Sequence, residues 1–235
     1  MGGQACVFYG AAEFSRDCDI VIFAEDTNFE RLQNALVDLQ ATCIAVPPFE
    51  RKYLDRGHAV HFRCKHPDAL DMRLDVMTKM RCVDDFEFLW ERRTTIEDQE
   101  KIRYEVLGVQ DLVKAKKTQR DKDWPMIRRL IESHYASNQI APTEDRIRFW
   151  LLESRTPVML MDLAANYSET AHSLIEKRLL LSDALNANER GVKQQLNDEQ
   201  NIEKEVDENY WAPLKKELEL IRMQIRTKLH DEKNI

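Results

Sequence analysis

The sequence predicts an α+β fold: a small mixed β-sheet with flanking helices, followed by a helical C-terminal region. In the first hundred or so residues, short apolar runs with strand-like composition alternate with one clear helical pattern. Beyond residue 105 the apolar spacing is helical almost to the end of the chain. We therefore expect two parts, an α+β core over residues 1–105 and a helical domain over residues 106–235. A chain of 235 residues is long enough for this division.

Apolar spacing places the elements of the first part. Residues 28–41 form the helix, because Phe29, Leu32, Leu36 and Leu39 recur at helical intervals. Strands are predicted over residues 19–23, 59–64 and 71–77, the last two separated by the turn-like KHPDA. Two further short strands are expected in FEFLWERR, residues 86–93, and YEVLGV, residues 104–109.

The second part is predicted to be helical throughout. Helices are expected over residues 109–117, 124–135, 143–154 and 169–185. The polar and acidic stretch between residues 186 and 209 predicts either a solvated helix or a flexible link. The last helix aligns Leu214, Leu218, Ile221, Ile225 and Leu229 on one face. Such a stripe packs against the body of the protein or against a partner.

The charge balance excludes a general attraction to nucleic acid or to an anionic membrane. The chain carries 35 basic and 42 acidic residues, a net charge of -7. Any contact with nucleic acid therefore needs a local basic patch. The densest basic run comprises Lys114, Lys116, Lys117, Arg120, Lys122, Arg128 and Arg129. This run predicts either a solvated helical face or a surface that contacts phosphate or RNA.

Cysteine usage and hydropathy predict a cytoplasmic protein with no membrane contact. The five cysteines include no C-x-x-C pair, and their odd number argues against a disulfide framework. The N-terminus lacks the basic and apolar regions of a signal peptide. The longest apolar stretch, residues 157–163, is far too short to span a bilayer.

Three aspartates form the candidate catalytic constellation. Asp17 and Asp19 share one face of a predicted strand, because successive side chains alternate between faces. Asp75 joins them if its strand lies beside theirs. Three carboxylates so close together do not all stay ionised without a cation, and hard oxygen ligands suit Mg²⁺ or Mn²⁺. Two such ions can activate a hydroxyl and stabilise a leaving pyrophosphate.

Two other sets of side chains have alternative interpretations. His58, His61, Cys64 and His66 invite a zinc site, but strand alternation turns His61 away from the others and no second ligand pair follows. We favour ordinary strand histidines and a buried thiol. The tryptophans Trp90, Trp150 and Trp211 are expected to pack in the core or at an interface.

A family resemblance strengthens the interpretation of the aspartates. The segments GGQA (residues 2–5), SRDCD (15–19) and RLDVM (73–77) resemble the polymerase-β-type nucleotidyltransferase superfamily. The signature of that superfamily is a glycine turn, an Asp-x-Asp pair and a third aspartate on a neighbouring strand. LGVQDLVKAKKTQRDKDW (107–124) is similar to a segment of bacterial members. The chain looks most like the minimal and abortive-infection-toxin-like enzymes over residues 1–130.

The resemblance implies a role for each matching residue. Asp17 and Asp19 would be metal ligands, and Asp75 would be the third ligand and help to deprotonate the acceptor hydroxyl. The implied nucleotide-binding residues are Gly2, Gly3, Ser15, Lys116, Arg120 and Lys122. In the family an apolar strand precedes the glycine turn, whereas here Gly2 follows Met1 directly. We therefore expect either an upstream start codon or a core that lacks this edge strand.

The implied reaction is transfer of a nucleoside monophosphate from a nucleoside triphosphate to an acceptor hydroxyl, assisted by two Mg²⁺ or Mn²⁺ ions. The acceptor remains open among RNA, a protein side chain and a small molecule. The resemblance also implies a toxin of a toxin–antitoxin pair, with an antitoxin as partner. The C-terminal stripe leaves open a second copy of the chain as a partner. The alternative is a catalytically inactive scaffold of the same fold that binds nucleotide or a partner protein.

Overall fold

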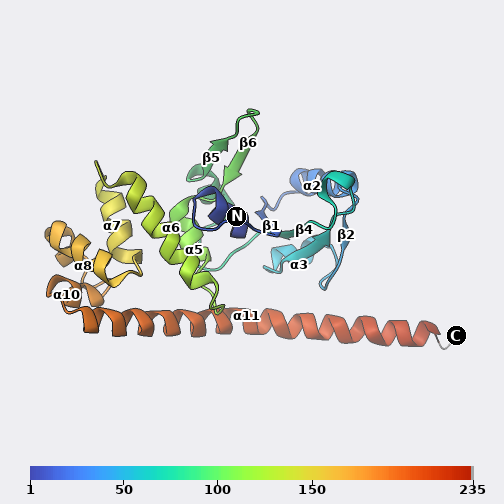
Figure 1. Ribbon diagram of the computed structural model, residues 1–235. Helices are drawn as coiled ribbons and strands as arrows, with labels where there is room; N and C mark the ends of the chain where they lie inside the picture. The colour runs from blue at the N-terminus through green and yellow to red at the C-terminus, as the bar shows by residue number, and fades with distance from the viewer. Residues whose placement is uncertain (234–235) are drawn as a thin grey trace. The chain divides into compact units, whose positions relative to one another are not determined.

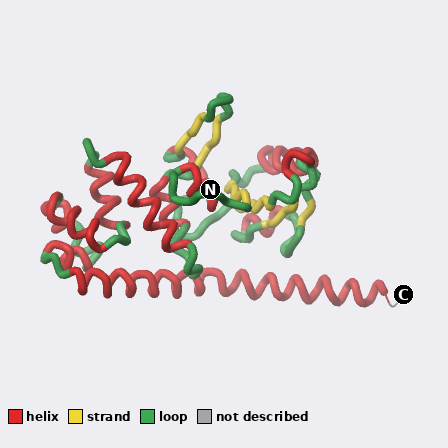
Figure 2. Tube along the Cα trace, in the orientation of Figure 1, coloured by secondary structure: helices red, strands yellow, loops and turns green. Residues whose placement is uncertain are grey.

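The computed structural model describes residues 1–233, with side chains through residue 227, and is mixed α+β (Figures 1 and 2). The chain divides into two compact units. Unit 1 comprises Met1–Ala5, Phe14–Gly108 and the chain from Glu208 onward. Unit 2 comprises Cys6–Glu13 and Val109–Asp207. Two helices, α1 (Gly2–Phe8) and α11 (Glu189–Lys233), have residues in both units.

A small mixed sheet organises unit 1, as the sequence predicts. Its strands are β1 (Asp17–Val21), β4 (Arg73–Met77), β3 (Val60–Arg63) and β2 (Thr42–Cys43), in that spatial order. Strand β1 is parallel to β4, whereas β3 is antiparallel to both of its neighbours. Strand β1 is therefore an edge strand, with β4 on one side only.

One face of this sheet is the apolar core of unit 1. It presents Cys18, Ile20, Val60, Phe62, Leu74 and Val76. Helix α2 (Asp26–Asp38) covers these side chains with Leu32 and Leu36, and helix α3 (Arg51–Asp55) adds Leu54. Because side chains alternate along a strand, this packing forces the polar residues of β1 and β4 onto the opposite face.

The segment FEFLWERR is helical, so the prediction of a strand there was wrong. Helix α4 (Phe86–Glu91) buries Leu89 and stacks Phe86 on Trp90, one helical turn away, with ring centroids 5.8 Å apart. In a strand these two rings would share a face but would lie too far apart to stack. A hairpin of β5 (Thr94–Glu97) and β6 (Arg103–Val106) follows, and the sequence predicted only its second strand.

The helices of unit 2 bury large apolar side chains between them. They are α5 (Val109–Ala115), α6 (Asp123–Asn138), α7 (Glu144–Glu153), α8 (Pro157–Asn166), α9 (Ser168–Ser173), α10 (Leu180–Leu185) and the first part of α11. Fully buried side chains include Ile127, Trp150 and Leu160. The single helix expected over residues 169–185 is instead α9 and α10. The turn between them carries Arg178, which reaches back to α7.

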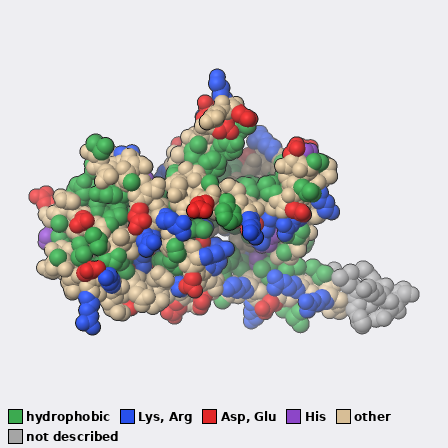
Figure 3. Space-filling model, viewed as in Figure 1, with side chains coloured by type: hydrophobic (Ala, Val, Ile, Leu, Met, Phe, Trp, Pro, Cys, Tyr) green, Lys and Arg blue, Asp and Glu red, His purple; other side chains and the backbone are tan. Residues whose placement is uncertain are grey.

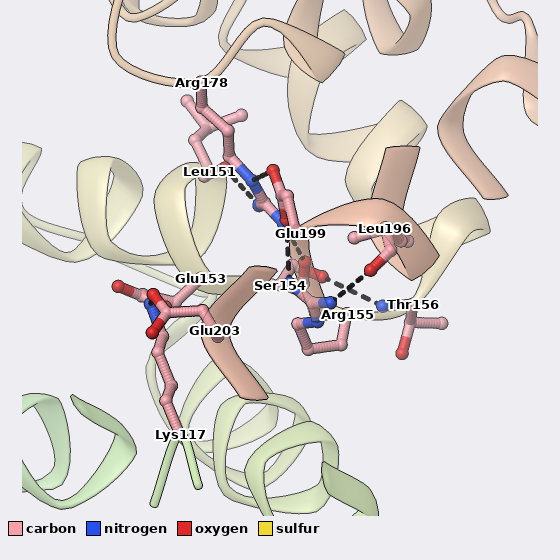
Figure 4. Close-up of polar contacts among 10 residues, drawn as sticks. All are labelled: Lys117, Leu151, Glu153, Ser154, Arg155, Thr156, Arg178, Leu196, Glu199 and Glu203. Carbon is pink, nitrogen blue, oxygen red and sulfur yellow. Dashed lines mark hydrogen bonds and ion pairs between the residues drawn. The ribbon is translucent and has the colours of Figure 1, made fainter. Parts of the chain in front are cut away.

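Arg178 belongs to a buried ionic network that ties helices of unit 2 together (Figure 4). Its guanidinium donates to the carbonyl oxygens of Leu151 and Ser154 at 2.9 Å, which terminate α7. Both Arg178 and Arg155 also bind the carboxylate of Glu199 on α11, at 2.8 Å and 2.7 Å. The orphan carbonyls at the end of α7 are therefore satisfied by a side chain.

Helix α11 resolves the alternatives left open for the C-terminal segment. The polar stretch from Glu189 onward is helical, continuous with the final amphipathic segment. In the predicted stripe Ile221 is buried and Leu214 and Leu218 are half-buried, whereas Ile225 is 40% exposed. Leu229 lies outside the side chains that the structure describes. Over residues 1–233, we find no helix with both the length and the apolar character needed to cross a bilayer.

Candidate functional site

The polar face of the sheet gathers the predicted catalytic aspartates. In the parallel pairing of β1 with β4, Asp17 lies opposite Arg73 and Asp19 lies opposite Asp75. In the antiparallel pairing of β3 with β4, His61 lies opposite Asp75. Paired residues on neighbouring strands project to the same face of a sheet. Three carboxylates, one guanidinium and one imidazole thus share the face opposite the core.

Asp75 is held by two side chains of its own sheet. Its Oδ1 accepts a hydrogen bond from Arg73 Nε at 2.8 Å and lies 2.8 Å from His61 Nδ1. His61 Nδ1 also lies 3.2 Å from Arg73 Nη2. Nδ1 cannot both donate to Asp75 and accept from Arg73. We therefore assign a proton to Nδ1, which donates it in a hydrogen bond to the ionised carboxylate of Asp75. Burial raises the pKa of Asp75, but the hydrogen bonds from His61 and Arg73 outweigh it and hold that pKa below its usual value.

Arg73 is the counter-cation of the whole acidic face. Its hydrogen bond to Asp75 raises the pKa of the guanidinium, burial opposes this, and the charges of Asp75, Asp17 and Asp19 raise it further. All three carboxylates are therefore near enough to stabilise the same positive charge. The chain itself supplies a cation among the aspartates.

The two glycines predicted to form a turn instead begin helix α1, and this first turn of the helix packs directly against the polar face. Gly2 has φ +65°, and a Cβ at this position would lie 1.8 Å from Asp19 Oδ2. The next residue, Gly3, donates its backbone N–H to the same oxygen at 3.3 Å, and a Cβ there would lie 2.4 Å from Ser15 Oγ. Ser15 Oγ donates to the carbonyl of Asp17 at 2.9 Å. The turn and Ser15 thus contact the Asp-x-Asp segment, and their predicted contact with phosphate stays a prediction.

The aspartates fit a hard divalent cation by chemistry, but Asp75 is engaged elsewhere. Asp17 and Asp19 present carboxylate oxygens on one face, the donor type that Mg²⁺ prefers. Asp75 Oδ1 already has Arg73 and His61 as neighbours. Within the described chain no group of three or more His, Cys, Asp or Glu side chains is arranged to hold a metal ion. Both contacts use the same oxygen of Asp75, so a cation shared by all three carboxylates would compete with Arg73 for the charge of Asp75.

The predicted nucleotide-binding cations belong to unit 2, where two of them have a structural role. Lys116 Nζ lies 3.1 Å from Asp123 Oδ1, and both side chains are buried. Arg120 Nε donates to the other oxygen of Asp123 at 2.8 Å. Lys122 directly precedes helix α6. Contact of Lys116, Arg120 and Lys122 with a triphosphate stays a prediction. The role of Asp123 as the common partner of Lys116 and Arg120 was not predicted from the sequence.

The basic run is largely compensated by neighbouring acids. Ion pairs of 2.8–3.9 Å join Lys114 to Asp111, Lys116 and Arg120 to Asp123, Lys117 to Glu153 and Arg128 to Glu132. Such pairing reduces the positive charge that this run can direct at a polyanion. Five residues of the run are nevertheless exposed, as a solvated face predicts: Lys114, Arg120, Lys122, Arg128 and Arg129. Contact of the run with phosphate or RNA stays a prediction.

The residues considered for zinc lie in different environments. His58 Nε2 is 2.9 Å from Glu217 Oε2, and His61 faces Asp75. Cys64 is buried in the core, where burial raises the pKa of its thiol. His66 Nδ1 accepts a backbone hydrogen bond at the turn η1 (Pro67–Ala69).

Sequence reasoning missed His61 and the extent of the role of Arg73 at the site. The alternation of His61 with the core residues Val60 and Phe62 was visible, but the strand pairing that brings it to Asp75 was not. Trp150 is fully buried as expected, whereas Trp90 is 42% exposed and is not a core residue.

Comparison with known proteins adds no name to this arrangement. No family model, curated protein or solved structure matches the chain. Function is therefore inferred from the polar face of the sheet. Its paired carboxylates can bind a divalent cation, and a cation held there can bind phosphate oxygens.

Proposed function

We propose that this chain is a metal-dependent nucleotidyltransferase. It would transfer a nucleoside monophosphate from a nucleoside triphosphate to an acceptor hydroxyl and release pyrophosphate. The observation that supports this most strongly is the alignment of Asp17 and Asp19 with Asp75 across two parallel strands. The first turn of α1 against Asp19 adds support, because it leaves no room for a side chain beside that carboxylate.

The residues of the polar face have distinct roles in this proposal. Asp17 and Asp19 would hold Mg²⁺ or Mn²⁺, and Asp75 would complete a site for two ions. Such ions, when bound, supply charge neutralisation and lower the pKa of an attacking hydroxyl. Arg73 holds Asp75 and would form an ion pair with an incoming phosphate. Most of the rate would come from positioning and electrostatic stabilisation, as is usual for phosphoryl-type transfer.

The acceptor and the biological role are broader proposals. RNA, a protein side chain and a small molecule all carry hydroxyl groups that suit the reaction. The toxin role with an antitoxin partner follows from the family resemblance alone. The homodimeric assembly follows from the C-terminal apolar stripe, and the cytoplasmic location follows from the cysteine usage. We keep Lys116, Arg120 and Lys122 as candidates for binding the triphosphate. Lys116 and Arg120 would have to bind it while paired with Asp123 or after leaving that carboxylate.

Transfer of label tests the proposal. The full chain would be incubated with each of the four α-labelled nucleoside triphosphates, Mg²⁺ and total cellular RNA, and labelled products separated. We expect label in RNA, in the protein or in a small molecule, and a loss of about 100-fold or more in Asp19→Asn. The matched control is Asp38→Asn, an equal charge change at an exposed position of α2. Asp19→Asn with near wild-type transfer would refute the assignment.

One observation favours a second candidate, an inactive scaffold that binds nucleotide or a partner. Arg73 and His61 already contact Asp75, so the chain itself offsets part of the negative charge of the acidic face. A scaffold would bind nucleotide without metal, keep that binding in Asp19→Asn and transfer no label. The enzyme would require the metal and would lose activity in the same variant.

A further inference from the structure

Unit 1 contains a half-open cavity of about 200 Å³ beside the candidate site. Its walls come from strand β1, helix α4 and the end of strand β6 with the residues that follow it. Most of the lining is apolar, and Arg93 and Glu105 provide the charged groups. Pockets for drug-sized ligands measure roughly 300–1,000 Å³. The cavity is therefore suited to one ring system and is too small for a complete nucleoside triphosphate.

A ladder of stacked planar groups ends at this cavity. Phe23 stacks on Phe86 with centroids 5.6 Å apart, and Phe86 stacks on Trp90 at 5.8 Å. The guanidinium of Arg93 lies 4.0 Å from the centre of the Trp90 ring. Phe86, Trp90 and Arg93 all line the cavity. A planar heteroaromatic ring can extend such a ladder, because bases stack on aromatic side chains and on guanidinium planes.

The cavity also has a polar group that can recognise the edge of a ring. Glu105 Oε2 accepts hydrogen bonds from Arg93 Nε at 2.7 Å and from Thr95 Oγ1 at 2.6 Å. A carboxylate has about four lone-pair sites, so these two bonds leave capacity for further donors. Exocyclic amino groups and ring N–H groups of bases are donors of this kind. An apolar lining with one convergent polar group is typical of a small-ligand site.

The position of the cavity relates it to the aspartates. Ile20 and Val21 of β1 line it, and Val21 shares the face of β1 that carries Asp17 and Asp19. Residues two apart on a strand are separated by about 6.6 Å. Val21, which lines the cavity, is thus the neighbour of Asp19 on the carboxylate face of β1. In Figure 3 the hairpin above this region is hydrophobic near its base and charged at its tip.

We propose that this cavity binds the base of a nucleoside. The size of the cavity, its stacked planar groups and its carboxylate each match a nucleobase. That the base belongs to the triphosphate substrate rests on the proposed function and on the nearness of Val21 to Asp19.

Binding of free nucleosides tests the cavity separately from catalysis. Adenosine, guanosine, cytidine and uridine would be titrated into the full chain by calorimetry, without metal. We expect at least one to bind with a Kd of roughly millimolar, about −4 kcal/mol. Trp90→Ala should weaken that binding about tenfold, and Trp90→Phe should restore most of it. Phe88→Ala is the matched control, a more exposed ring on the same helix that does not line the cavity.

The outcomes separate the two proposals. Because the nucleoside has no phosphates, Asp19→Asn should leave its binding unchanged. Nucleoside binding that depends on Trp90 but no label transfer would keep the cavity assignment and remove the enzymatic one. Label transfer with an unchanged KM for the triphosphate in Trp90→Ala, with the variant folded by thermal melting, would overturn the cavity assignment. Absence of nucleoside binding, or equal weakening in Phe88→Ala, would also overturn it.

Discussion

Replacing Gly2 with alanine tests whether the N-terminal turn positions the carboxylate of Asp19. A Cβ at Gly2 would lie 1.8 Å from Asp19 Oδ2, whereas ordinary contacts begin at 3.4 Å. The two groups must therefore separate by about 1.6 Å, and a misplacement of about 1 Å in a catalytic geometry can lower the rate by about 100-fold. We expect Gly2→Ala to lower kcat/KM for label transfer by at least about 100-fold. The assay is single-turnover transfer at saturating Mg²⁺.

Gly10→Ala separates this steric effect from backbone strain. Gly10 also has a positive φ, +72°, but a Cβ there would meet only Ser133 Oγ, at 3.6 Å. Both variants place alanine in the left-handed region, which costs about 1–2 kcal/mol. Urea unfolding should therefore show at least this backbone cost in both variants, while transfer is lost only in Gly2→Ala. Wild-type transfer by Gly2→Ala, or an equal loss in Gly10→Ala, would refute the reasoning.

Two predictions concern the internal ion pairs. Arg73→Gln removes the cation that competes for Asp75, so Mn²⁺ should bind about tenfold more tightly by paramagnetic resonance; unchanged affinity would show that Arg73 does not compete. Asp123→Asn leaves Lys116 buried without its carboxylate and should lower the free energy of unfolding by about 3 kcal/mol, against less than about 0.5 kcal/mol for exposed Asp121→Asn. Burial raises the pKa of Asp123, but Lys116, Thr118 and Arg120 outweigh it and hold the pKa low, so its stabilisation exists at neutral pH and is lost as pH falls through that pKa. Unfolding curves of wild type and Asp123→Asn should converge in acid, and a constant difference would contradict this.

The alternation of apolar and polar residues made the sheet and its two faces predictable. Cys18 and Ile20 face the core while Asp17 and Asp19 face away, because a side-chain period of two leaves no other choice once one face is buried. The mixed character of the sheet was also predictable. The assignment of Asp75 to the same face followed from its own strand.

The strand order and the stacking of rings within helix α4 could not be predicted from the sequence. The position of His61 beside Asp75 depends on β3 pairing with β4, a choice made by the packing of the whole sheet. FEFLWERR has strand-like composition, yet Phe86 and Trp90 gain contact at helical spacing. This contact between residues four apart forms only in a helix, and it outweighs a weak strand propensity. Asp123 lies in the first turn of α6, where an acidic residue is common, so its buried pairing with Lys116 could not be predicted from its position.

The guanidinium held among the aspartates has a consequence for how the protein matures. In many small metalloproteins the ion supplies the energy of folding, and the empty chain has no stable structure. Here Arg73 offsets the mutual repulsion of the acidic groups from within the chain. Assembly of the sheet and loading of an ion can therefore be separate events, so that magnesium would govern when the protein acts without governing whether it folds.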